Sequence, residues 1–121
     1  MNSTPQAKPF ITSESKPTPF DKPVEFCKYA LAANETVFVE YKVLGVLNDS
    51  GAHAEVIQCV ANGKKGVICY ESDTVGNLEA LPNVCAQFNS VSRNLCLQIT
   101  QSIEKTPLPW KVEASFVSVR V

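Results

Sequence analysis

The chain has 121 residues, of which 45% are hydrophobic and 19% are charged, and its formal net charge is −1. These values are typical of one soluble globular domain. The balance of 11 basic and 12 acidic residues lacks the basic surplus that phosphate binding requires, so we expect no nucleic-acid partner. No stretch approaches the roughly 20 apolar residues that cross a bilayer, so we expect no membrane partner. The N-terminal residues also lack the pattern of a secretory signal, which predicts assembly in a cytoplasm.

Residues 1–23 differ in composition from the rest of the chain, because they contain five of its eight prolines. Proline fixes φ and removes an amide donor, so this segment is not expected to join a central strand or a helix. We predict an extended N-terminal arm over residues 1–23 and a β-sandwich domain over residues 24–121. The arm should bind a partner, either a neighbouring subunit or its own domain, through five candidate residues: Phe10, Ile11, Pro17, Pro19 and Phe20.

From Val24 onward the hydrophobic pattern has a period of two, which indicates β-strands. Over residues 24–31 two phases are open, one through Cys27 and Tyr29 and the other through Val24 and Phe26. Further strands are predicted at 37–43, 54–60, 66–70, 84–88, 95–99 and 110–121. The expected apolar faces are Val37, Val39, Tyr41 and Val43, then Ala54, Val56 and Val60, then Val84, Ala86 and Phe88, then Leu95, Leu97 and Ile99.

The last predicted strand changes phase. Trp110, Val112 and Ala114 share one face, whereas the next valines, from Val117 on, have the other parity. A slip of one residue within a strand indicates a β-bulge, which we place near Ser115 and Phe116.

Turn residues separate the predicted strands. Strong turn signals occur at residues 48–51 and 62–63, and longer loops are expected at 72–77 and 92–94. Seven or so short strands with such spacing predict an all-β fold, an antiparallel β-sandwich or a jelly-roll-like domain.

The sequence contains no pattern of a catalytic site. The single histidine, His53, lies between two alanines, without the serine context of a hydrolase triad. Acidic residues are scattered, and phosphate-binding glycine motifs are absent. We therefore expect no catalytic residue, no metal and no cofactor. We expect Trp110 to cap one end of the core; a role as an interface anchor or as a platform for carbohydrate stacking is the alternative.

Five cysteines stand at positions 27, 59, 69, 85 and 96. Their number is odd and their spacing fits neither a zinc finger nor a disulfide framework. We interpret them as reduced thiols that pack in the domain or are partly exposed; a metal or redox role is the alternative.

Residues 30–121 resemble small β-sandwich domains of tailed-bacteriophage virion proteins. The likeness rests on the strand NLCLQIT followed by PWKVEASFVSV, although Gln101 and Ser102 replace the Thr-Gly turn that often closes the first of these strands. The resemblance implies a noncatalytic, typically trimeric structural protein of the virion.

Three functions follow from these observations. The first is a capsid decoration (cement) protein, located on the virion, whose arm binds the major capsid protein. The second is a tail-fibre, baseplate or receptor-binding module bound to tail proteins. The third is a small enzyme, such as a cysteine hydrolase or an isomerase on a jelly roll; a cupin is excluded because one histidine does not provide its metal site.

Overall fold

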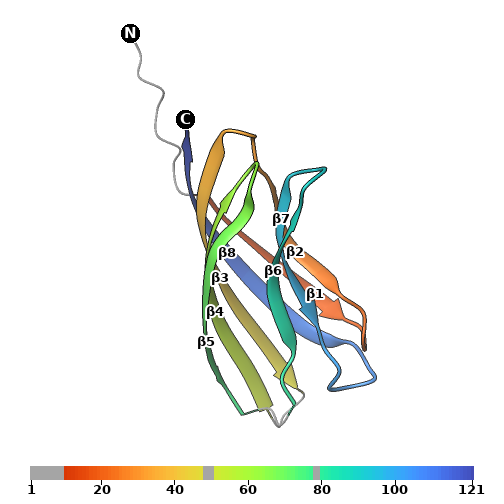
Figure 1. Cartoon of the computed structure of the whole chain (residues 1–121). Helices are drawn as coiled ribbons and strands as arrows, with labels where there is room; N and C mark the ends of the chain where they lie inside the picture. Colours follow the sequence, from red (N-terminus) through yellow and green to blue (C-terminus); the bar gives the residue numbers. More distant parts are fainter. Residues whose placement is uncertain (1–9, 48–50, 78–79) are drawn as a thin grey trace.

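The computed structural model describes residues 10–47, 51–77 and 80–121, which form two antiparallel sheets packed face to face (Figure 1). The predicted β-sandwich is confirmed. The strands are β1 (Phe10–Thr18), β2 (Val24–Ala30), β3 (Glu35–Leu47), β4 (Gly51–Asn62), β5 (Gly66–Gly76), β6 (Asn83–Asn89), β7 (Asn94–Thr100) and β8 (Leu108–Arg120). The larger sheet has the order β1-β8-β3-β4-β5, and the smaller has the order β2-β7-β6. In this described part of the chain no helix is long and apolar enough to cross a membrane.

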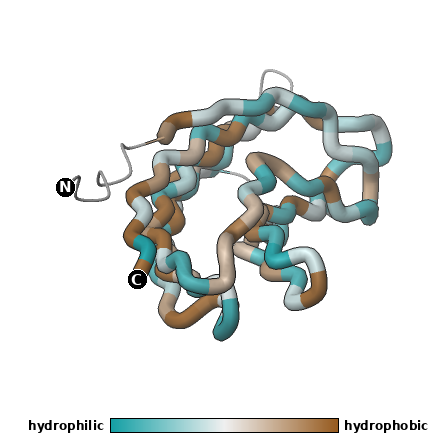
Figure 2. The backbone as a smooth tube through the Cα atoms, turned by 90° about the horizontal axis from the view of Figure 1, so that it is seen from above, coloured by the Kyte–Doolittle hydropathy of each residue, from teal (hydrophilic) through white to brown (hydrophobic). Residues whose placement is uncertain are grey.

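The core lies between the two sheets and is built mainly by alternation along β3, β4, β7 and β8. Figure 2 shows how hydropathy varies along the backbone of the two layers. The expected inward faces of β3 and β7 are confirmed, because all of their members are at most 3% exposed. In β6, Val84 is buried, and Ala86 and Phe88 are partly buried against the core.

The inward face of β4 is the opposite of the expected one. The side chains that point into the sandwich are His53, Glu55, Ile57, Cys59 and Ala61. The pairing with β3 decides this, since Ile57 lies beside Tyr41 and Cys59 beside Val39. The expectation was wrong because two polar residues, His53 and Glu55, occupy inward positions. They interrupt the apolar alternation from which the buried face of a strand is predicted.

The bulge predicted in the last strand is also wrong. β8 pairs with β3 without interruption from Trp110 to Arg120. Phe116 and Ser118 keep the inward phase, and Val117 and Val119 point to solvent. A small polar residue, Ser118, occupies a core position because its hydroxyl donates a hydrogen bond to the buried Glu35.

The β-bulge that the structure does contain in the smaller sheet lies in β2, between Phe26 and Tyr29. Cys27 has a φ of 55°, the left-handed conformation that non-glycine residues seldom adopt. The bulge changes which alternate residues face the core. Both patterns considered for residues 24–31 therefore occur, with Phe26 facing the core before the bulge and Tyr29 packing against it after the bulge.

Of the predicted connections, two turns are present, one expected loop is a strand, and one turn lies mostly outside the described residues. The turns after Asn62 and after Asn89 are present, and each asparagine side chain accepts hydrogen bonds from the backbone of its turn. Residues 72–76, expected in a loop, belong to β5. Of the predicted turn at 48–51, residues 48–50 lie outside the described part.

The N-terminal segment differs from the expected division at residue 23. Residues 10–18 form β1, an edge strand that pairs with β8 over its whole length. The proline within this strand, Pro17, is compatible with the edge position, since an edge strand tolerates a missing amide donor. The domain therefore begins at residue 10 or earlier, and residues 1–9 lie outside the description.

Candidate functional site: the outer face of the five-stranded sheet

Two of the predicted partner-binding residues lie on the outer side of β1. Ile11 is 64% exposed, and Pro17 is also exposed. In the register with β8, Ile11 stands opposite Ser115 and Pro17 opposite Pro109, all on the side of the sheet that faces away from the core. These two residues therefore extend the outer face of the larger sheet.

The other three predicted residues contact their own domain. The ring of Phe10 lies 5.9 Å from that of Phe116, between centroids, and is half exposed. Phe20 forms a β-bridge with Gln101 and lies under the ammonium group of Lys105. Pro19, directly before it, is half-buried.

One end of the outer face is apolar. Phe38 on β3 is 44% exposed, and its neighbour across the strand pair, Val117 on β8, is 46% exposed. Val119, the next residue of β8 on the same face, is 58% exposed. On the other side of Phe38 stands Val60 of β4. These four residues form a continuous apolar surface, which we call the valine patch.

The opposite end of the same face is apolar as well. Leu44 and Val46 on β3 and Val75 on β5 are 50%, 43% and 74% exposed, respectively. Ala54 of β4 stands between Leu44 and Val75 in the register of the sheet. This second surface is the leucine patch.

A band of charged and amide side chains separates the two patches. Lys42 lies next to Glu113 in the sheet, and Glu40 accepts a hydrogen bond from Gln58 at 3.1 Å. Shallow hollows of about 180 and 200 Å³ open beside Lys42. The band therefore carries charges of both signs between two surfaces of exposed apolar side chains.

This composition is unusual for the solvent side of a sheet. In an antiparallel sheet with one exposed face, outward positions are normally polar. Apolar outward residues that neighbour one another mark surfaces at which proteins associate. We therefore take the outer face of β8, β3, β4 and β5 as the candidate site and call it the docking face.

Two titratable side chains of the core, His53 and Glu55, form a buried pair. His53 is 1% exposed and its Nε2 lies 2.9 Å from an oxygen of Glu55, which is 9% exposed. Glu55 also lines the edge of a shallow hollow that opens on the outer face of the larger sheet. Among the described residues, no group of three side chains has the arrangement of a metal site.

Trp110 has the expected structural role. It is 2% exposed, its ring lies against His53 with 6.0 Å between centroids, and it covers Gly45. A Cβ atom on Gly45 would stand 2.2 Å from the indole ring, so the glycine is needed for the tryptophan to close this end of the core.

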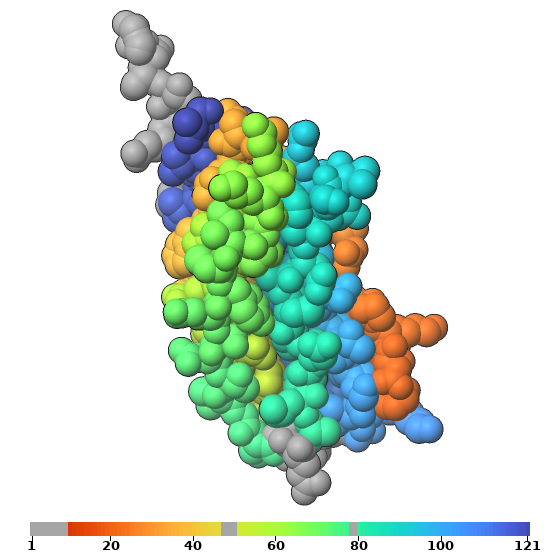
Figure 3. All heavy atoms as spheres, viewed as in Figure 1, coloured from red at the N-terminus to blue at the C-terminus, as the bar shows by residue number. Residues whose placement is uncertain are grey.

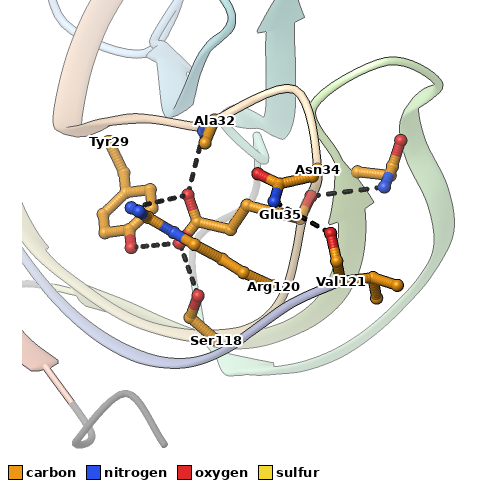
Figure 4. Close-up of polar contacts among 8 residues, drawn as sticks. Tyr29, Ala32, Asn34, Glu35, Ser118, Arg120 and Val121 are labelled. Atoms are coloured by element: carbon orange, nitrogen blue, oxygen red, sulfur yellow. Dashed lines mark hydrogen bonds and ion pairs between the residues drawn. The ribbon is translucent and has the colours of Figure 1, made fainter. Parts of the chain in front are cut away.

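Glu35 organises the end of the sandwich next to the valine patch (Figure 4). Its carboxylate accepts hydrogen bonds from the Tyr29 hydroxyl at 2.7 Å, the Ala32 amide at 2.9 Å and the Ser118 hydroxyl, and Arg120 lies 3.8 Å away. Burial alone would raise the pKa of Glu35, but these hydrogen bonds and the nearby guanidinium lower it below its usual value. The carboxylate therefore stays ionised and joins β2, β3 and β8.

Sequence reasoning missed the docking face. Val117 and Val119 were assigned to a core face after a bulge, and Phe38 was not singled out. Ser118 gave no signal, because a serine between two valines is compatible with an inward or an outward position until its partner, Glu35, is known. No protein-family model, no curated protein and no solved structure gives a significant match to the chain.

Proposed function

We propose that this chain is a noncatalytic structural module that attaches to a larger protein assembly through its docking face. The observation that carries the proposal is the valine patch, in which Phe38, Val117 and Val119 are each between two-fifths and three-fifths exposed. Covering an apolar side chain gains roughly 25 cal/mol for each Å² removed from water. Ile11 and Pro17 add to the same face from β1, which keeps these two candidate residues in the proposed interface.

The assembly we propose is the outer shell of a bacteriophage capsid. The support is the resemblance of residues 30–121 to virion β-sandwich domains, together with the exposed apolar patches of the docking face. On this proposal the partner is the major capsid protein and the chain is a decoration protein, and the trimer that the resemblance implies is part of the proposal. The alternative is a tail-fibre, baseplate or receptor-binding module of the phage tail.

The abundance of the chain on purified particles tests this assignment. Quantitative mass spectrometry should find an amount comparable to that of the major shell protein, because only the lattice offers so many sites. A far smaller amount would place the chain on the tail, and its absence from the particles would overturn the virion assignment.

A pair of variants tests the docking face itself. Phe38→Ser combined with Val117→Ser removes the apolar contact without changing a buried residue, so we expect at least a tenfold loss of attachment to particles. The matched control is Val91→Ser, which changes a valine that is 93% exposed in the β6–β7 turn. Equal attachment of both variants, with unchanged circular dichroism, would refute the docking face.

A further inference from the structure

The outer face of the smaller sheet contains a polar hollow of about 270 Å³. Its floor is Cys96, in the middle of the central strand β7. The side chains around it are longer and polar, and the main ones are Glu25, Lys28, Gln87, Asn94 and Gln98. The hollow exists because a short side chain at the centre of the sheet is surrounded by longer ones. In Figure 3 the surface of β6 lies next to that of β5.

The register of the sheet explains why these residues meet. Gln98 pairs with Glu25 of β2, Cys96 with Gln87 of β6, and Asn94 with Asn89 of β6. Lys28 joins them because the bulge at Cys27 places two residues of β2 opposite Cys96. Bulges commonly redirect a side chain toward a functional surface.

The carboxylate of Glu25 is held in one orientation. Lys28 Nζ lies 3.2 Å from Glu25 Oε1, and the Cys96 thiol donates to Oε2 at 3.5 Å. The hydrogen bond from Lys28, followed by that from Cys96, lowers the pKa of Glu25, so the group is ionised at neutral pH. One carboxylate and one ammonium cancel, so the hollow favours a neutral ligand.

We propose that this hollow binds a single neutral sugar ring, such as the terminal residue of a glycan. Asn94 and Gln98 each present an amide that both donates and accepts hydrogen bonds, which is the chemistry that adjacent hydroxyl groups require, and Glu25 accepts from a third. The volume lies just below the roughly 300–1,000 Å³ of sites for drug-sized molecules. The hollow faces away from the docking face, so a chain attached to an assembly would present the sugar site outward.

Ligand-observed saturation-transfer NMR on the full chain tests the proposal. The probes are the methyl glycosides of glucose, galactose, mannose, fucose and N-acetylglucosamine. We expect at least one to bind, and Asn94→Ala and Gln98→Ala each to weaken its affinity tenfold or more. The control is Gln58→Ala, which removes an amide from the outer face of the other sheet and should leave the affinity unchanged.

Three results would overturn the sugar site: no signal from any of the five glycosides, binding that survives both substitutions, or an equal loss in Gln58→Ala. Folding of each variant is checked by the dispersion of its amide NMR spectrum. The Phe38→Ser, Val117→Ser variant should keep full sugar binding, so failure of the sugar site and failure of the docking face are distinguishable.

Discussion

At the scale of single residues, burial divides the five cysteines into two groups. Cys27, Cys59 and Cys96 are at most 3% exposed, whereas Cys69 is exposed and Cys85 is half-buried. None forms a disulfide, which agrees with the expectation of packed or partly exposed thiols. Burial raises the pKa of Cys27 and Cys59 to about 11 and that of Cys96 to about 12. Since the thiolate is the reactive species, the buried thiols should be inert.

Alkylation of the native protein with iodoacetamide at pH 8 checks this division. Peptide mass spectrometry should show Cys69 modified first and Cys85 more slowly. The three buried cysteines should react only after denaturant is added, which provides the internal control. Early modification of Cys59 or Cys96 in native buffer would contradict the structure.

The carboxylate of Glu35 is a second feature at this scale. Glu35→Ala leaves the Tyr29 and Ser118 hydroxyls without their acceptor, so we expect the free energy of unfolding to fall by about 3 kcal/mol. The comparison is Glu40→Ala on the docking face, which should change it by less than about 0.5 kcal/mol. Urea denaturation measures both, and equal effects would contradict the role assigned to Glu35.

The same residue predicts a pH dependence. The pKa of Glu35 is lower in the folded protein than its usual value of 4.5, so the folded state favours the ionised form. Its contribution to stability is complete above the unfolded-state pKa and is lost as the pH falls through the folded-state pKa. Wild type should therefore lose more stability than Glu35→Gln when the pH is lowered from 6 to about 3.

At the scale of elements, β1 is the segment whose role changed most between sequence and structure. Glu14 on β1 accepts a hydrogen bond from the Cys27 amide at the β2 bulge, and the Lys16 ammonium donates to the carbonyl of Glu25 at 2.7 Å. β1 therefore pairs with the larger sheet and also closes one open side of the sandwich against β2.

Truncation measures the contribution of β1. Deleting residues 1–18 removes the strand and uncovers the edge of β8, so we expect the free energy of unfolding to fall by more than about 3 kcal/mol, or the chain to aggregate. Deleting residues 2–9 is the control, because it keeps every described contact of β1. If the two truncated proteins had the same denaturation midpoint, β1 would not contribute to the stability of the domain. That result would instead fit an N-terminal arm that is separate from the domain.

At the scale of the whole molecule, both edges of the larger sheet carry features that oppose pairing with another chain. On the β1 edge, charged side chains turn inward toward β2. On the β5 edge, Glu71 and Asp73 are exposed and the register shifts next to Ile68. Such charges and bulges are known protections against edge-to-edge association. Contacts through the faces are therefore favoured over strand addition.

Removing the acidic residues from the β5 edge tests this protection. Glu71→Thr with Asp73→Thr should raise the rate of self-association several-fold, as followed by light scattering at neutral pH. Glu40→Thr is the comparison, because it removes a carboxylate from an inner strand of the same sheet. Unchanged scattering of the double variant would show that the two acids are not needed to protect the edge.

The sequence by itself determined the class of fold, because the alternation of apolar and polar residues along a strand is visible without knowing which strands pair with one another. Val37 to Val43 and Leu95 to Ile99 were assigned to the core on that basis, and the structure agrees. The asparagine turn after β4 could also be predicted, since the side chain of Asn62 bonds to the backbone of its own turn. These features depend on residues that are adjacent in the chain.

Only the tertiary structure decided which face of β4 and of the end of β8 is buried. In both strands polar residues occupy inward positions. Ser118 bonds to Glu35, which is distant in sequence, and on β4 the inward residues His53 and Glu55 bond to each other beside Trp110. The edge position of β1 depends on β8, which lies about a hundred residues further along the chain. The docking face and the sugar site arise from strands brought together by pairing, so no local pattern could have shown them.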